Sequence, residues 1–217
     1  MRCRSVASRP RRRGPAYVVA QPGEGTWWHA GVVAMVVGAH IGPWSEEDLV
    51  GLPDDVQRYE LLEGTLLVSP PPSGAHQLVS LRLAGVLDDA TTPGLAVVEA
   101  MGVRLPDNTV FIPDVVVATR DVVVANGSGI LDSAAVTLVV EIVSPGSRTT
   151  DRLTKPAVYA RAGIASFWRV ELEDGPAITA YSLNQGRYAE AGSARPGQRL
   201  AVDKPFPFSV DRADLRP

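Results

Sequence analysis

The chain of 217 residues is 45% hydrophobic, which is enough for one α/β or α+β domain with a packed core. Its single cysteine, Cys3, excludes a disulfide framework and a thiolate metal cluster. The net charge is −3, but residues 1–43 hold six arginines and one acid, so the remainder carries 15 basic and 23 acidic residues, or −8. An acidic body argues against a broad, non-specific nucleic-acid surface but still allows a locally basic cleft.

Residues 1–43 differ from the rest of the chain. RPRRRGP at 9–15 is typical of a solvated basic arm, and the apolar run WWHAGVVAMVVGAHI at 27–41 is shorter than the roughly 20 residues that span a bilayer. No clear signal-peptide pattern follows the arginines. We predict a basic, poorly ordered extension over residues 1–43, with a nucleic-acid-binding arm as the alternative. Residues 44–217 are predicted to form a single domain, in a cytoplasmic protein without membrane contact.

The folded part opens with a short helix and a hairpin. Ser45, followed by three acids, predicts a helix that ends by Pro53. RYELLEGTLLVSPPP at 58–72 predicts a β-hairpin that turns at Glu63-Gly64. Glu60 lies in the first strand of this hairpin, where an acid considered alone more often faces outward.

A longer helix is predicted over Gly74–Asp89, because its apolar residues form one stripe at helical spacing. His76 falls in the first turn of this helix. The positive end of a helix disfavours a cationic histidine, so His76 is expected to be neutral and able to accept or donate a hydrogen bond.

Two strand patterns and a loop follow. Residues 95–105 predict a strand broken by Gly102, and VFIPDVVVA at 110–118 predicts the next. Pro113 belongs at a strand edge or a bulge, because proline cannot donate to the ladder. The polar segment from Arg120 to Ala135, with glycines at its centre, is predicted to be a mobile loop.

Asp114 and Glu141 are unusual because each interrupts an apolar, β-branched run. VTLVVEIV at 136–143, which carries Glu141, is apolar on both faces and is therefore predicted to be a central strand. A buried carboxylate is normally paired, protonated or bound to a metal. Two carboxylates on neighbouring strands repel each other unless a cation lies between them, so we expect one there.

The helix after this strand carries further polar residues. Asp151, Lys155 and Tyr159 are spaced four apart, which places them on one helical face. Pro156 conflicts with a continuous helix, since an interior proline costs about 3 kcal/mol or more. In the alternative, the helix begins with Thr154 as its cap, which leaves Asp151 in a loop and Lys155 at the helix start.

The remaining residues predict a strand at 165–171, a hairpin around 184–186 and a last edge at 204–210. The central order is therefore helix, strand, strand, strand, helix, strand. This order predicts an α/β class fold, more specifically α+β with a mixed sheet and flanking hairpins.

Several short motifs, in order, resemble the Uma2 family of restriction-endonuclease-like proteins in the PD-(D/E)XK nuclease superfamily. The resemblance covers about residues 44 to 210. Its motifs are YELLEG (59–64), a helix opening with His76, PDVVV (113–117), VEIVSP (140–145), D-R-x-x-K-x-x-x-Y (151–159) and AGIASFW (162–168).

The resemblance implies a restriction-endonuclease-like core and a set of catalytic residues. Asp114 takes the place of the strand aspartate of the superfamily, and Glu141 that of the following acid. Val143 stands where the usual lysine would be, and the resemblance implies that Lys155 on the next helix replaces it. Glu60 is implied as the third carboxylate.

Carboxylate oxygens are hard ligands suited to Mg²⁺ or Mn²⁺. We predict that Asp114, Glu141 and Glu60 hold the metal and that Lys155 supports it electrostatically in DNA hydrolysis. The predicted substrate-positioning residues are His76, Tyr159 and Asp151.

Two alternatives to a nuclease remain at this point. The same fold can serve as a binding or regulatory module with a degenerate site, which the acidic body and Pro156 favour. In a purely structural alternative, Asp114 and Glu141 pair with arginines such as Arg148 or Arg152. Many nucleases of the superfamily are dimeric, so a homodimer is also expected.

Overall fold

We describe the fold from a computed structural model, which places residues 40–52, 56–173, 175–195 and 197–216. Most of the predicted N-terminal extension, including Cys3, lies outside these residues. Across the described residues, no helix is long and apolar enough to cross a membrane.

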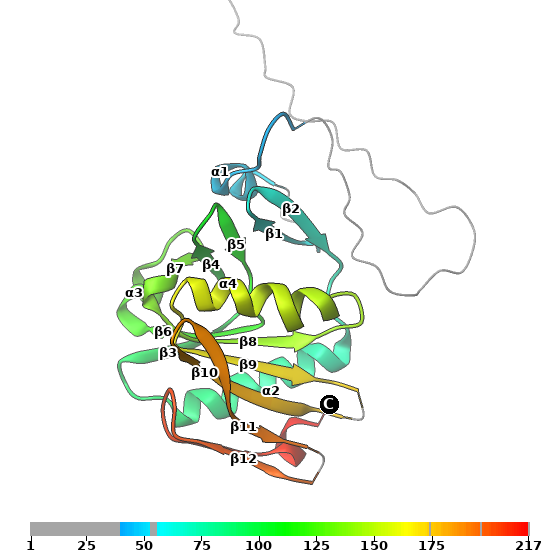
Figure 1. The fold of residues 1–217 in the computed structure, drawn as a ribbon, viewed down its shortest axis with the longest axis vertical. Helices are drawn as coiled ribbons and strands as arrows, with labels where there is room; N and C mark the ends of the chain where they lie inside the picture. The colour runs from blue at the N-terminus through cyan, green and yellow to red at the C-terminus, as the bar shows by residue number, and fades with distance from the viewer. Residues whose placement is uncertain (1–39, 53–55, 174, 196, 217) are drawn as a thin grey trace, which may run out of the picture.

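A six-stranded mixed sheet forms the centre of the molecule (Figure 1). Neighbouring strands are antiparallel except β8 and β9, which are parallel. In spatial order the strands are β11 (Arg187–Ala194), β10 (Ala177–Asn184), β9 (Ser166–Glu171), β8 (Val136–Val143), β6 (Val115–Thr119) and β3 (Leu95–Glu99).

Two helices cover opposite faces of this sheet. Helix α2 (Gly74–Ala90) packs against one face, where Leu83 belongs to the same buried cluster as Val140 and the alternate residues of β8. Helix α4 (Lys155–Arg161) packs against the other face, where Val158 and Val139 belong to a second buried cluster. The chain order α2, β3, β6, β8, α4, β9 confirms the predicted core of a restriction-endonuclease-like fold.

A second sheet of five strands lies beside the first, in the order β2, β1, β5, β4, β7. Its opening hairpin turns at Glu63 and Gly64, both with positive φ, which is the tight turn that the sequence predicts. Helix α1 (Glu46–Val50) is capped by Ser45 as expected. The strands are β1 (Arg58–Leu62), β2 (Thr65–Ser69), β4 (Gly102–Leu105), β5 (Thr109–Phe111) and β7 (Ile130–Asp132).

The C-terminal hairpin prediction around residues 184–186 is confirmed by β10 and β11. The last strands, β12 (Arg199–Val202) and β13 (Phe208–Asp211), pair with each other and pack on the same core as α2. A short 3₁₀ turn, Arg212–Leu215, ends the described chain.

The prediction of a mobile loop from Arg120 to Ala135 is wrong. This segment forms helix α3 (Arg120–Ala125), strand β7 and a 3₁₀ turn, Ser133–Ala135. Leu131 is fully buried in β7, which pairs in parallel with β4. Burial of the apolar pair Ile130 and Leu131 therefore outweighs the polar, glycine-containing residues that precede it.

The predicted strands at 95–105 and 110–118 each divide between the two sheets. The first breaks at Ala100, which has φ +51°, rather than at Gly102. The second breaks between Phe111 and Val115. The two breaks lie together, since the Ala100 amide donates to the Asp114 carbonyl at 3.1 Å, and Asp114 thus lies where the chain passes from one sheet to the other.

Candidate active site

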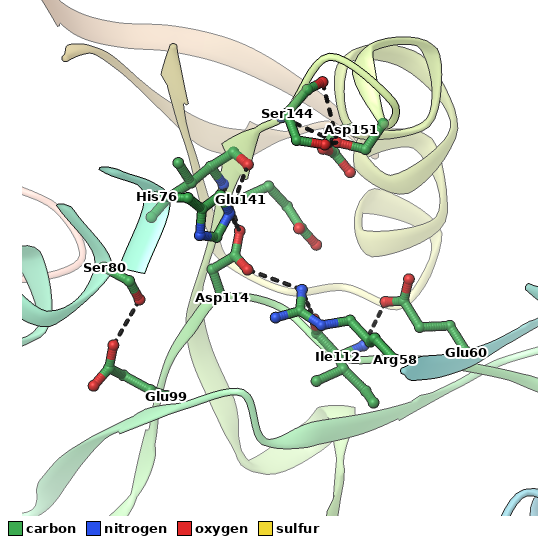
Figure 2. Close-up of polar contacts among 12 residues, drawn as sticks. Arg58, Glu60, His76, Ser80, Glu99, Ile112, Asp114, Glu141, Ser144 and Asp151 are labelled. Carbon is green, nitrogen blue, oxygen red and sulfur yellow. Dashed lines mark hydrogen bonds and ion pairs between the residues drawn. The ribbon is translucent and has the colours of Figure 1, made fainter. Parts of the chain in front are cut away.

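A cavity of about 440 Å³ opens where the two sheets meet. Figure 2 shows the carboxylates of Glu60, Asp114 and Glu141 directed towards a common space from three different segments. Every predicted site residue except Tyr159 lines this cavity. The charged and histidine side chains in its wall are Arg58, Glu60, His76, Asp114, Glu141, Asp151 and Lys155.

Asp114 is buried and accepts hydrogen bonds on both carboxylate oxygens. Arg58 Nη1 donates to Oδ1 at 2.9 Å, and the Ile142 amide donates to Oδ2 at 2.7 Å. The Nε2 atom of His76 lies 3.2 Å from the same Oδ2. Burial opposes ionisation, but the His76 and Arg58 contacts and the amide bond outweigh it and lower the pKa of Asp114 to about 2.

Lys155 lies among three carboxylates. Its Nζ atom is 3.0 Å from Glu60 Oε1, 3.1 Å from Glu141 Oε1 and 3.6 Å from Asp151 Oδ1. Burial disfavours the charged amine, but these carboxylates outweigh burial and raise the pKa of Lys155 above its usual value. Lys155 therefore stays protonated across the neutral range.

Glu141 is the most deeply buried of the acids, at 1% exposure. It accepts a hydrogen bond from the Tyr159 hydroxyl in addition to its contacts with Lys155. Burial and the neighbouring acids Asp151 and Asp114 raise its pKa well above the ordinary glutamate value, although Lys155 opposes this. The prediction of a central, buried strand acid is thus matched by the geometry.

The approach to α4 resolves the conflict that Pro156 poses. A π-helical turn, Thr150–Thr154, leads directly into α4, which begins at Lys155. Lys155 stands at the start of α4 as in the second alternative, but Thr154 has helical dihedrals and no side-chain cap hydrogen bond, and Asp151 lies in the π turn and not in a loop. Asp151 is buried and accepts a hydrogen bond from the Ser147 hydroxyl, which fixes it beside Lys155.

His76 and Tyr159 contact carboxylates. His76 Nε2 lies 3.1 Å from the Ile142 carbonyl as well as close to Asp114, and since both neighbours are acceptors, Nε2 carries a proton. Within the described part of the chain, the buried Nδ1 atom of His76 has no hydrogen-bond partner. Burial and the adjacent Glu141 raise the pKa of the Tyr159 phenol, so Tyr159 is a neutral donor.

With this geometry established, comparisons with known proteins decide the family. The model of the Uma2 family, described as "Putative restriction endonuclease", matches residues 46–215. The chain belongs to the Uma2 family. This confirms the resemblance drawn from the sequence motifs, and it makes the protein a member of a nuclease-like family.

A solved structure from Anabaena variabilis ATCC 29413, titled as a "putative nuclease belonging to DUF820", has a similar fold. The match has a TM-score of 0.64 and 18% sequence identity, and it covers 80% of this Uma2 chain and 97% of the other. At this identity the likeness shows the fold alone. The curated proteins include no significant match to this chain.

The Uma2 cavity fits a divalent cation in charge and in donor chemistry. Four acids face two permanent cations, Arg58 and Lys155, so with all groups ionised the wall carries a net charge of −2. Carboxylate oxygens are the ligands that Mg²⁺ and Mn²⁺ prefer. In the described residues no three His, Cys, Asp or Glu side chains are grouped as metal ligands, because protein cations lie between the acids.

The arginines named in the structural alternative do not contact the central acids. Arg148 contacts Glu173, and Arg152 Nη2 lies 2.8 Å from Glu171 Oε2. Sequence analysis missed the arginine that does reach Asp114, which is Arg58. Strand alternation could have identified it, since Arg58 lies two positions before Glu60 and so shares its face.

Proposed function

We propose that this Uma2 protein is a metal-dependent endonuclease that hydrolyses DNA phosphodiester bonds. The observation that carries the proposal is the cavity lined by Glu60, Asp114 and Glu141, in which the buried Lys155 amine lies among Glu60, Glu141 and Asp151. Asp114, Glu141 and Glu60 would hold the ion, Mg²⁺ or Mn²⁺. When bound, such an ion polarises a phosphate oxygen and lowers the pKa of a coordinated water.

Lys155 acts as an electrostatic catalyst. Because its amine stays protonated, it cannot take a proton from water, but it donates hydrogen bonds to a nucleophilic water or to a phosphate oxygen that gains negative charge. Asp151, itself held by Ser147, keeps the amine directed into the cavity. Asp151 is therefore proposed as a positioning residue for Lys155.

His76 and Tyr159 act through the carboxylates that they touch. The His76 Nε2 proton orients Asp114 Oδ2, and the Tyr159 hydroxyl orients Glu141. Outer contacts of this kind fix the direction and basicity of metal ligands. We propose both as positioning residues for the ligands, in place of the direct phosphate contact expected from the sequence.

One observation favours a second function, a nucleic-acid-binding module without catalysis. Asp114, Glu141 and Glu60 each have cationic protein partners already, so the cluster is neutralised in part without a metal. In this alternative the ion pairs are permanent and the protein does not bind Mn²⁺.

The deciding experiment combines cleavage with metal binding. Plasmid and single-stranded DNA are incubated with Mg²⁺ or Mn²⁺, or with a chelator, using wild type, Asp114→Asn and the exposed control Asp89→Asn. Binding of Mn²⁺ is followed in parallel by electron paramagnetic resonance. Metal-dependent cleavage lost only in Asp114→Asn supports the nuclease. Absence of both cleavage and Mn²⁺ binding in the wild type, with DNA binding retained, favours the binding module.

A homodimer and a cytoplasmic location stay predictions of the sequence. Sedimentation at several protein concentrations tests the first, since a monomer at micromolar concentration would contradict it.

A further inference from the structure

Arg58 stands at the boundary between two cavities. Beside the cavity already described lies a second one of about 290 Å³. The residues common to both walls are Arg58, Pro72, His76 and Asp114. The Arg58 guanidinium is therefore reached from both sides, and its side chain keeps 22% exposure while that of Asp114 keeps 3%.

The contacts of Arg58 use one end of its guanidinium. Nη1 donates to Asp114 Oδ1 at 2.9 Å and to the Ile112 carbonyl at 3.3 Å, as Figure 2 shows. The other carboxylate oxygen, Oδ2, already faces the Ile142 amide and His76. Arg58 thus occupies the oxygen of Asp114 through which an incoming cation would most readily bind.

We propose that Arg58 is an internal counter-ion that a divalent ion displaces, and that the released guanidinium then binds a phosphate of the substrate strand. The inference rests on the proposed metal-dependent function and adds an order of events to it. A divalent ion that binds Asp114 Oδ1 would lie next to the guanidinium already on that oxygen and repel it, so the ion and Arg58 compete for this oxygen. Once released, the planar guanidinium fork suits a phosphate, which accepts two parallel hydrogen bonds from it.

The charge of the cavity supports this sequence of events. The wall holds four acids against two cations, an acidic balance that repels a phosphate while no ion is present and that a bound divalent ion offsets. Glu99, held by the Ser80 hydroxyl at 2.6 Å, adds an acid to the second cavity. A phosphate is therefore expected at the boundary of the two cavities, within reach of Arg58, and only when the ion is bound.

The test measures how much Arg58 contributes to DNA binding when the ion is present and when it is absent. A fluorescent single-stranded oligodeoxynucleotide is titrated with wild type, Arg58→Gln and the control Arg187→Gln. Arg187 is exposed on β11, at the opposite edge of the six-stranded sheet from β3. Each titration is repeated over a range of salt concentrations, in Ca²⁺ and in chelator, with strand integrity checked on a denaturing gel.

Loss of one phosphate contact lowers the magnitude of the negative slope of log K against log salt by about 0.7 for single strands. We expect this loss for Arg58→Gln in Ca²⁺ only, with equal slopes for wild type and variant in chelator and no change for Arg187→Gln. We also expect Arg58→Gln to bind Ca²⁺ more tightly, because the competitor is gone. A slope change that is the same with and without Ca²⁺, or absent in both, overturns the inference.

These outcomes are distinguishable from failure of the proposed function. If wild type cleaves DNA but the effect of Arg58 does not depend on the ion, the inference alone fails. If wild type neither cleaves nor binds the oligonucleotide, both fail.

A measurement on wild type covers the case in which Arg58→Gln does not fold. In a crystal structure grown with Ca²⁺, we expect the Arg58 guanidinium to lie beyond hydrogen-bond distance of Asp114 Oδ1. A guanidinium that remains on Oδ1 beside a bound ion overturns the proposal.

Discussion

The amine of Lys155 lies 3.0 Å from Oε1 of Glu60, and this contact joins the helix on one sheet to the first hairpin of the other. Glu60 Oε1 also accepts a hydrogen bond from the Ile112 amide at 2.7 Å. The lysine therefore has a structural task, holding the two sheets together, in addition to its proposed electrostatic one. Its substitution should affect both stability and activity.

Lys155→Gln is expected to lower the free energy of unfolding by about 3–5 kcal/mol, because it leaves buried carboxylates without their cation. It is also expected to reduce DNA cleavage by about 10²-fold or more. Urea unfolding and initial cleavage rates measure the two effects, with the exposed Lys204→Gln as control. Unfolding curves that overlay for Lys155→Gln and wild type would show that the buried ion pairs contribute nothing.

A divalent ion is expected to stabilise the wild type. An ion at a hundredfold excess over its dissociation constant adds about 2.7 kcal/mol, which corresponds to a rise in Tm of about 5–10 °C for a chain of this length. Asp114→Asn should lose most of this rise and Asp89→Asn should keep it. Thermal melts in chelator, Mg²⁺ and Mn²⁺ check this, and an equal rise in Asp114→Asn would place the ion elsewhere.

Glu141→Gln should change how stability depends on pH. Burial raises the pKa of Glu141, so the folded chain holds this proton above the ordinary value of 4.5 and the wild type loses stability as pH rises from there through the raised pKa. The variant lacks this loss. In chelator, its stability relative to wild type is therefore expected to increase with pH and then level off.

Denaturant unfolding from pH 4 to pH 9 measures this difference. The comparison uses the change with pH rather than the absolute stability, because the amide also alters contacts with Tyr159 and Lys155. A difference that stays constant over the whole range would mean that Glu141 ionises as freely in the folded chain as in the unfolded one.

Tyr159→Phe removes the hydroxyl that donates to Glu141 without changing the packing of the ring against Phe111 and Phe167. Loss of an outer contact to a metal ligand typically costs about 10- to 100-fold in metal affinity or activity. We therefore expect weaker Mn²⁺ binding and slower cleavage by such a factor. Mn²⁺ titration compares Tyr159→Phe with the control variant Tyr181→Phe. Equal Mn²⁺ affinities for the two variants would contradict the positioning role of Tyr159.

Much of the core could be predicted because its signals are local. The apolar run at 136–143 indicates a strand buried on both faces, and Glu141 stands out because it interrupts that run. The apolar stripe of α2, and the place of His76 in its first turn, follow from helical spacing. For Glu60 the strand pattern alone was insufficient, and the family resemblance was needed to identify it as a site residue.

What could not be predicted depends on contacts distant in sequence. The division of residues 95–105 and 110–118 between two sheets is set by pairing with β1 and β6, which no local pattern records. The π turn that brings Asp151 beside Lys155 is likewise a tertiary effect, since it accommodates Pro156 while both side chains are buried. The partner of Asp114, Arg58, comes from the other sheet for the same reason.

The meeting of two sheets at the cavity has a consequence during synthesis. The hairpin with Glu60 leaves the ribosome long before Lys155, and β9, the parallel neighbour of β8, follows only after α4. Nascent chains that end before α4 lack Lys155 and therefore lack a complete cavity, whatever local structure they form. On the proposed function, a truncated or half-made product therefore cannot cut the DNA of the cell that makes it.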